Sequence, residues 1–299
     1  MWHYCLIPTV TAGRRDSLMR ALAEFIMRGR MQAGLVAFFG NLVPFISPAA
    51  VSLVTLTRGS SEGFLLALWA LMPLLVILFT SNDANAIVTL LSIVSVVCVW
   101  LASELMRLRS SWPEVLIFIV AMSAISTILM AIFFADKLTV LETLIADFFK
   151  GTQQYENKFV IGRNFLVGIA GYVVALTSVF SLMLGRWWQA ALYNPGGFKL
   201  EFHQLRFSVT SSVIILAGMF IFEYFLQDCS SWASLLSLPL MLSGIALLHY
   251  SVTFFQLNSY WLLVFYVALL FLSPLSIMLV GVGFLDSIFN IRSRLSKHH

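Results

Sequence analysis

The residues best suited to bind a small polar molecule lie on one face of an apolar stretch in the last quarter of the chain. Ser243, Ala246, His249, Thr253 and Gln256 are spaced by three or four residues, which places them on the same side of a helix. Such polar groups in an apolar setting either hydrogen-bond to neighbouring helices or line a pocket for a solute. Both interpretations stay open, and we take His249, Thr253 and Gln256 as candidate substrate-binding residues.

A fourth candidate binding residue is Asn41, which begins the segment NLVPFISPAA. Pro44 and Pro48 each remove a backbone donor and disrupt the preceding turn of a helix. Interrupted helices of this kind build binding sites in many transporters. The same break is compatible with a kink that serves packing alone.

The polar segment RWWQAALYNPGGFKLEFHQLR, from Arg186 to Arg206, contains the pair closest to an acid–base couple, Glu201 and His203. Residues two positions apart point to nearly opposite sides of a helix, so we do not expect these two to act together. The chain contains no phosphate-binding loop, nucleophile elbow, zinc-protease motif or paired cysteines. We therefore expect no enzyme activity, no cofactor and no metal site.

Composition defines the class of protein more firmly than these residues do. Of the 299 residues, 60% are hydrophobic and 11% are charged, whereas about a quarter of the residues of soluble domains are charged. The charges fall mostly between apolar runs, a pattern typical of membrane topology. We expect the chain to fold in a lipid bilayer and see no sign of nucleic-acid binding.

Eight apolar runs are close to the ~20 residues that cross a bilayer core. They are 33–57, 63–80, 86–103, 115–135, 164–185, 207–227, 232–256 and 260–285. We predict an all-α polytopic integral membrane helix bundle of about eight transmembrane helices plus short interfacial amphipathic helices, all in one membrane domain at 19–299. Residues 1–18 lack a signal-peptide core, and we expect them to be a flexible extension or the product of too early a start codon.

Two segments are predicted to lie on the membrane surface. Residues 137–150, KLTVLETLIADFFK, have apolar side chains at helical spacing and acids on the other face. In the Arg186–Arg206 segment, paired tryptophans beside an arginine are typical of the interface, and Asn-Pro-Gly-Gly predicts a turn between two short helices. The interfacial residues are Arg186, Trp187, Trp188, Asn194, Pro195, Gly196, Gly197, Phe198, Glu201, His203 and Arg206.

Gly29, Ala33 and Ala37 form a ridge of small residues, four positions apart, that lets another helix approach closely. The ridge serves either internal packing or the docking of a partner such as a coupling subunit. If the chain crosses eight times with its N-terminus in the cytoplasm, the cytoplasmic segments hold twice as many Lys and Arg residues as the outside segments. If the run 33–57 instead entered and left the membrane on the same side, the excess of Lys and Arg inside would be smaller and the C-terminus would lie outside. By the positive-inside rule we therefore predict both termini in the cytoplasm.

The Arg186–Arg206 segment, the N-terminal MRALAEFIMRGRMQAGLVAFFGNLVPFISPAAVSLVTLTRG and the C-terminal GFLDSIFNIRSRL resemble the YybS-like family of bacterial inner-membrane proteins. The resemblance covers essentially everything from Met19 onward. The family has no established activity, and it looks distantly like the substrate-binding subunits of energy-coupling-factor vitamin transporters. Those are helical bundles of about six spans, rather than eight, that work with a transmembrane coupling subunit and ATPases.

These observations favour a solute-binding or transport component in the bacterial inner membrane that works with a separate energising partner. The alternative is a structural or assembly protein of the membrane with no transported ligand. The small-residue ridge and the interfacial helices favour that second function.

Overall fold

The computed structural model describes residues 14–80, 83–140, 142–143, 162–258, 260–272 and 274–297, and none of these residues is in a strand. Among these residues, five helices are long and apolar enough to cross a membrane. They are α4 (Ser60–Thr80), α5 (Asp83–Arg109), α6 (Trp112–Phe133), α8 (Arg163–Tyr193) and α11 (Ser230–Phe254). The predicted all-α membrane class is confirmed, and the count of eight spans is not.

The first apolar run, predicted as one span over 33–57, is two helices joined by a turn. α2 (Arg30–Phe39) passes through the 3-10 turn η1 (Gly40–Leu42) into α3 (Ile46–Arg58). Near the turn at residues 40–45, which we call the tip, the hydroxyl of Ser47 donates to the carbonyl oxygen of Ala37 at 2.6 Å. At the open end, Nη2 of Arg58 donates to the carbonyl oxygen of Met27 at 2.6 Å. The chain therefore enters the bundle and returns, and we call this unit the α2–α3 hairpin.

The two prolines explain why this run breaks. Phe45 has a left-handed backbone, with φ of 69°, directly after Pro44, and it ends the helical path. Pro48 then lies in the first turn of α3, where a missing N–H costs nothing because no intrahelical acceptor is available. The prolines thus separate two helices instead of bending one.

Two further predicted spans are shorter or bent. The 207–227 run contains α10 (Val209–Tyr224), which Ser208 caps by accepting from the backbone N–H of Ser211 at 3.1 Å. The last run contains α12 (Tyr260–Phe271) and α13 (Pro274–Phe289), which differ in direction by 120° and make a sixth span if they count as one.

Three helices are short or lie outside the predicted spans. α1 (Arg14–Arg28) includes residues that we expected in a flexible extension, and residues 1–13 lie outside the described chain. The other two are α9 (Gly197–His203) and α14 (Ile291–Lys297). In the predicted surface helix 137–150, residues 137–140 and 142–143 are helical, and the remainder lies outside the described residues.

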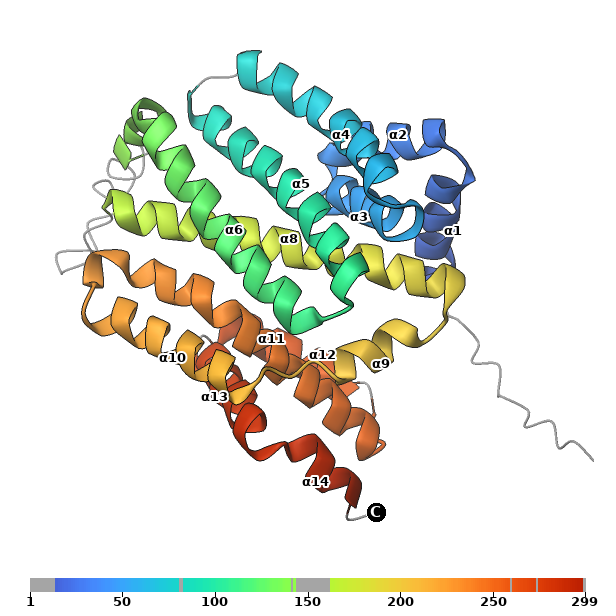
Figure 1. The fold of residues 1–299 in the computed structure, drawn as a ribbon, viewed down its shortest axis with the longest axis vertical. Coiled ribbons are helices and arrows are strands. Elements are labelled where there is room, and N and C mark those ends of the chain that lie inside the picture. The colour runs from blue at the N-terminus through green and yellow to red at the C-terminus, as the bar shows by residue number, and fades with distance from the viewer. Residues whose placement is uncertain are drawn as a thin grey trace, which may run out of the picture.

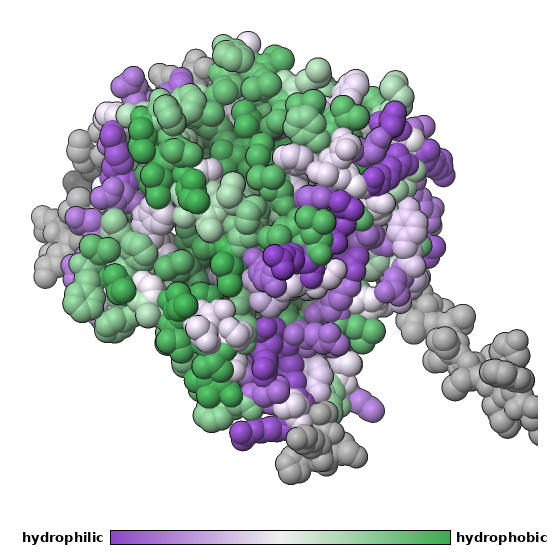
Figure 2. All heavy atoms as spheres, in the orientation of Figure 1, coloured by the Kyte–Doolittle hydropathy of each residue, from purple (hydrophilic) through white to green (hydrophobic). Residues whose placement is uncertain are grey.

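The long helices run side by side, and α1 lies across the end of the bundle where α8 finishes (Figure 1). We call this the α9 end. Trp112, which begins α6, packs edge-on against Phe198 of α9 with ring centroids 6.0 Å apart. At the opposite end, which we call the α11 start, the hydroxyl of Ser231 donates to the carbonyl oxygen of Phe165 at 2.7 Å. Hydrophilic side chains gather over the parts of Figure 2 where α1 and α14 lie, and hydrophobic ones cover much of the rest.

Glycines allow the helices to approach each other closely. A Cβ on Gly244 of α11 would lie 2.2 Å from the carbonyl oxygen of Leu279 on α13, and a Cβ on Gly283 would lie 2.2 Å from that of Leu240. α11 and α13 therefore cross backbone to backbone, which only glycine permits at these positions. Such contacts are the usual basis of helix association in lipid, where apolar surface alone gives little preference between protein and lipid neighbours.

Candidate functional site

The tip of the α2–α3 hairpin opens into a hollow of about 350 Å³. The hollow lies between the tip, α5 and α8, and its polar lining residues are Asn41, Ser92, Ser95 and Thr177. Nδ2 of Asn41 donates to the carbonyl oxygen of Ala70 at 2.9 Å, and Ala70 lies midway along the 21 residues of α4. The hollow is therefore at mid-depth along α4, on the outer side of the bundle, where Leu42 and Val88 are exposed.

The lining of this hollow suits a small uncharged polar molecule. No Lys, Arg, Asp or Glu contributes to it, and the remaining lining residues are apolar or glycine. The hydroxyl of Ser92 donates to the carbonyl oxygen of its own helix at Val88, at 3.0 Å. Ser95 is buried, with 3% of its surface exposed. A volume of a few hundred Å³ with a few convergent polar groups is typical of small-molecule sites.

Asn41 was predicted from the sequence as a binding residue, whereas Ser92, Ser95 and Thr177 were missed. These three come from α5 and α8, which follow the hairpin by dozens of residues. Serine and threonine are common in membrane helices, where they bond back to their own backbone. Nothing in their spacing therefore indicated that they share a wall with Asn41.

The predicted stripe on α11 does not form one binding wall. Ser243 and Ala246 are fully buried, and Nε2 of His249 lies 2.7 Å from the hydroxyl of Tyr266 on α12. Thr253 is exposed, and Gln256 follows the end of α11 with a positive φ of 52°. The structure thus separates Thr253 and Gln256 from the buried part of the stripe, and it brings none of the three candidates to Asn41.

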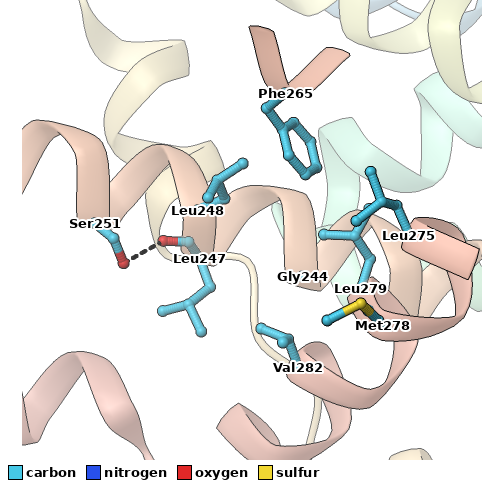
Figure 3. Close-up of a pocket in the computed structure, with 9 residues that line it drawn as sticks. All are labelled: Gly244, Leu247, Leu248, Ser251, Phe265, Leu275, Met278, Leu279 and Val282. Atoms are coloured by element: carbon cyan, nitrogen blue, oxygen red, sulfur yellow. Dashed lines mark hydrogen bonds between the residues drawn. The ribbon is translucent and has the colours of Figure 1, made fainter. Parts of the chain in front are cut away.

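A second hollow, of about 250 Å³, lies on another face of α11 and is lined also by α12 and α13 (Figure 3). Its lining residues are Gly244, Leu247, Leu248, Ser251, Phe265, Leu275, Met278, Leu279 and Val282. Its one hydroxyl, on Ser251, donates to the carbonyl oxygen of Leu247 at 2.9 Å. This hollow offers a solute no free donor, so it fits hydrocarbon and not a polar ligand.

The Arg186–Arg206 segment differs from its prediction in one important respect. α8 continues unbroken to Tyr193, so Trp187 and Trp188 belong to a long helix instead of a short interfacial one. Trp187 is half-buried, and Trp188 is completely buried in a cluster with residues of α1, α2 and α3. Tertiary packing therefore covers the ring of Trp188, which we expected to anchor the chain at headgroup depth, and its interfacial position stays a prediction.

The predicted turn is present, with Asn194 ending α8 and Gly196 adopting a φ of 88° that favours glycine. Beyond it, Glu201 forms a two-pronged ion pair with Arg186, with one of the two N–O distances at 3.0 Å. Gln189 hydrogen-bonds to Arg186 and donates to the carbonyl oxygen of Leu56 at 3.1 Å. This network joins α9 to α8 and α3. Because Glu201 is paired with Arg186, it is not available as an acid–base partner of His203.

The ridge residues serve the interior of the protein. Ala33 and Ala37 are buried in the cluster that joins the α2–α3 hairpin to α4. Gly29 lies between α1 and α2 in an extended conformation, so the three residues do not share one helix. The structure therefore uses the two alanines for internal packing.

Among the described residues, no group of three or more His, Cys, Asp or Glu side chains is placed to hold a metal ion. Comparison of the chain with family models, with curated proteins and with solved structures finds no match to any of them. The function is therefore argued from the geometry of the site.

Proposed function

We propose that this integral membrane protein binds a small uncharged polar solute in the hollow at the tip of the α2–α3 hairpin. The observation that carries the proposal is the position of that hollow, at the break between two helices and at mid-length of α4. Secondary transporters bind their substrates at such breaks, because interrupted helices expose backbone groups that lie near the middle of the membrane.

The protein would act as the solute-binding component of a transport system. It has no nucleotide-binding motif, so transport would need a separate energising partner. The family resemblance implies about six spans. The five or six long apolar helices agree with that number better than the eight spans predicted from the sequence. We place the protein in the bacterial inner membrane on the strength of that resemblance.

We further propose that the α9 end faces the cytoplasm. Basic residues mark the cytoplasmic side of membrane proteins. At the α9 end lie Arg14, Arg15, Arg20, Arg28, Arg30, Arg58, Arg107, Arg109, Arg186, Lys199, Arg206, Arg292, Arg294 and Lys297, whereas the described residues at the α11 start include only Lys137 and Arg163. With a re-entrant hairpin the C-terminus would still be inside, because the bend after α12 returns the chain to α11, where Arg292 of α14 lies 3.4 Å from the carbonyl oxygen of Ser243.

Ligand-dependent thermal stabilisation of the purified protein in lipid nanodiscs tests solute binding. The probes are a panel of vitamins and nucleobases. Thr177→Val removes one hydroxyl from the hollow without changing side-chain shape, and Thr80→Val removes an exposed hydroxyl at the end of α4. We expect a solute that raises the unfolding temperature of the wild type and of Thr80→Val, with an affinity weakened about tenfold in Thr177→Val.

Failure of every solute in the panel to stabilise the wild type would contradict the proposal and favour the structural or assembly function. Equal affinity of a stabilising solute for the wild type and Thr177→Val would place its binding site elsewhere.

A further inference from the structure

Two arginines from distant parts of the chain meet at Ser243 of α11. Nη2 of Arg292, on α14, donates to the carbonyl oxygen of Ser243 at 3.4 Å. The hydroxyl of Ser243 donates to the carbonyl oxygen of Leu205, at 3.3 Å, and Leu205 directly precedes Arg206. These contacts bring the backbone before Arg206 close to Arg292, and the charge of Arg206 is near enough to lower the pKa of Arg292.

Several donors of these two cations have no hydrogen-bond acceptor among the described residues. Arg292 is 8% exposed and Arg206 is half-buried. Nη1 of each is buried without a hydrogen-bond partner among the described residues. A buried cation normally has its donors satisfied, because desolvating an ammonium or guanidinium group without compensation is costly.

The nearby carboxylate, Asp286, holds the backbone through one oxygen, whereas its other oxygen has no hydrogen-bond partner among the described residues. It is fully buried, and its Oδ1 accepts the backbone N–H of Ile291 at 3.0 Å, which fixes the start of α14. Its Oδ2 lies 3.4 Å from Nε of Arg292, a long ion pair. Asp286 is therefore the ion-pair partner of Arg292, and no carboxylate is paired with Arg206 among the described residues.

The titratable histidine nearby does not offset the positive charge of the two arginines. Burial, followed by the charge of Lys199 and then by His249 and Arg292, lowers the pKa of His203 to about 4. His203 is then neutral at pH 7 and supplies no negative charge. Burial also lowers the pKa of Arg292, which Asp286 opposes and Arg206 reinforces. The two arginines thus repel each other, and Asp286 offsets this only at Arg292.

We propose that a phosphate-class anion binds between Arg206 and Arg292 and completes this cluster. Guanidinium groups recognise phosphate oxygens through pairs of parallel N–H···O bonds. The anion has two possible sources at this depth, the headgroup of an anionic lipid or a free phosphate from solution. Basic pockets between helices on the cytoplasmic side are typical sites for anionic headgroups. The site lies apart from the hollow at Asn41, so it does not depend on the proposed solute.

The experiment measures thermal unfolding of delipidated protein in an uncharged detergent. One arm titrates inorganic phosphate, a second titrates a short-chain phosphatidylglycerol, and a third titrates the corresponding zwitterionic phosphatidylcholine. Arg206→Gln removes one cation, and Arg294→Gln removes an exposed cation of α14 as the matched control. We expect a saturable rise in the unfolding temperature that needs at least tenfold more anion in Arg206→Gln and is unchanged in Arg294→Gln.

The arms separate the two sources of the anion. A response to inorganic phosphate as well as to phosphatidylglycerol indicates a free anion site, whereas a response to phosphatidylglycerol alone indicates a headgroup site. A wild type that neither anion stabilises, or an Arg206→Gln variant that retains wild-type affinity, would overturn the proposal.

A measurement without anion checks for a purely structural role of Arg206. Removing one of two repelling cations should leave the unfolding temperature of Arg206→Gln equal to or above that of the wild type. A marked fall would mean that Arg206 stabilises the fold by its own contacts, which would contradict the proposed excess of positive charge.

Discussion

Asn41, at the tip of the α2–α3 hairpin, donates a hydrogen bond to the backbone carbonyl oxygen of Ala70 at 2.9 Å. The same nitrogen lies 3.3 Å from the carbonyl oxygens of Ala37 and Phe38. One amide thus joins the end of α2 to the middle of α4, and it keeps the broken backbone at the depth of the hollow. In lipid no water is available to hydrogen-bond to free backbone groups. Such a contact therefore replaces the hydrogen bonds that an interrupted helix loses.

Replacing Asn41 with Leu should therefore destabilise the protein by about 1–2 kcal/mol, the effect of leaving buried acceptors without their donor. The measurement is the free energy of unfolding in an SDS titration from mixed micelles. Gln204→Ala, which changes an exposed amide after α9, is the control and should differ little from the wild type. An unchanged free energy for Asn41→Leu would show that the hairpin tip does not depend on this bond.

Two glycines near the crossing of α11 and α13 should respond to alanine in opposite directions. At Gly244 a new methyl group would meet the Leu279 carbonyl oxygen at 2.2 Å, so helix separation should cost about 2–3 kcal/mol. At Gly281, on α13, no atom lies within 4 Å of the added carbon, and alanine should stabilise the helix by about 0.5–1 kcal/mol. SDS unfolding measures both, and a similar loss in the two variants would contradict the crossing.

The position of His203 predicts a dependence of stability on pH. Its folded pKa of about 4 lies below the ordinary histidine value of about 6.5, because burial and then Lys199 oppose protonation. Between these two values the unfolded chain binds a proton that the folded chain does not, so stability falls as pH decreases through this window. The unfolding temperature measured from pH 7.5 to 5 should fall less steeply in His203→Gln. Equal slopes would mean that His203 titrates normally.

The sidedness of the bundle can be read from cysteine accessibility in intact cells. Cys229 lies at the α11 start, and Gly197 lies at the α9 end. In a Cys5→Ser background, a membrane-impermeant maleimide should label the natural Cys229 from outside. A cysteine at Gly197 should react only after the membrane is permeabilised. Labelling of both sites from outside, or the reverse order, would contradict a cytoplasmic α9 end.

The candidate site was partly predictable. Pro44 and Pro48 marked the break in the first apolar run, and Asn41 was assigned to the hollow that the break creates. The partners of Asn41 were not predictable, since Ser92, Ser95 and Thr177 reach the hollow only when α5 and α8 pack against the hairpin. Likewise, no local pattern connects Arg206 with Arg292, because their proximity depends on how α14 returns to α11.

The sequence by itself determined that the chain is an all-helical membrane protein and where its charges interrupt the apolar runs. Both properties follow from hydropathy, which is local along the chain. The tertiary structure alone decided that α2 and α3 fold back instead of crossing and that Trp188 is buried. The physical reason is that lipid and the protein interior are both apolar. An apolar side chain is about equally stable in lipid and in the protein interior, so only packing against other helices decides whether it faces lipid or is buried.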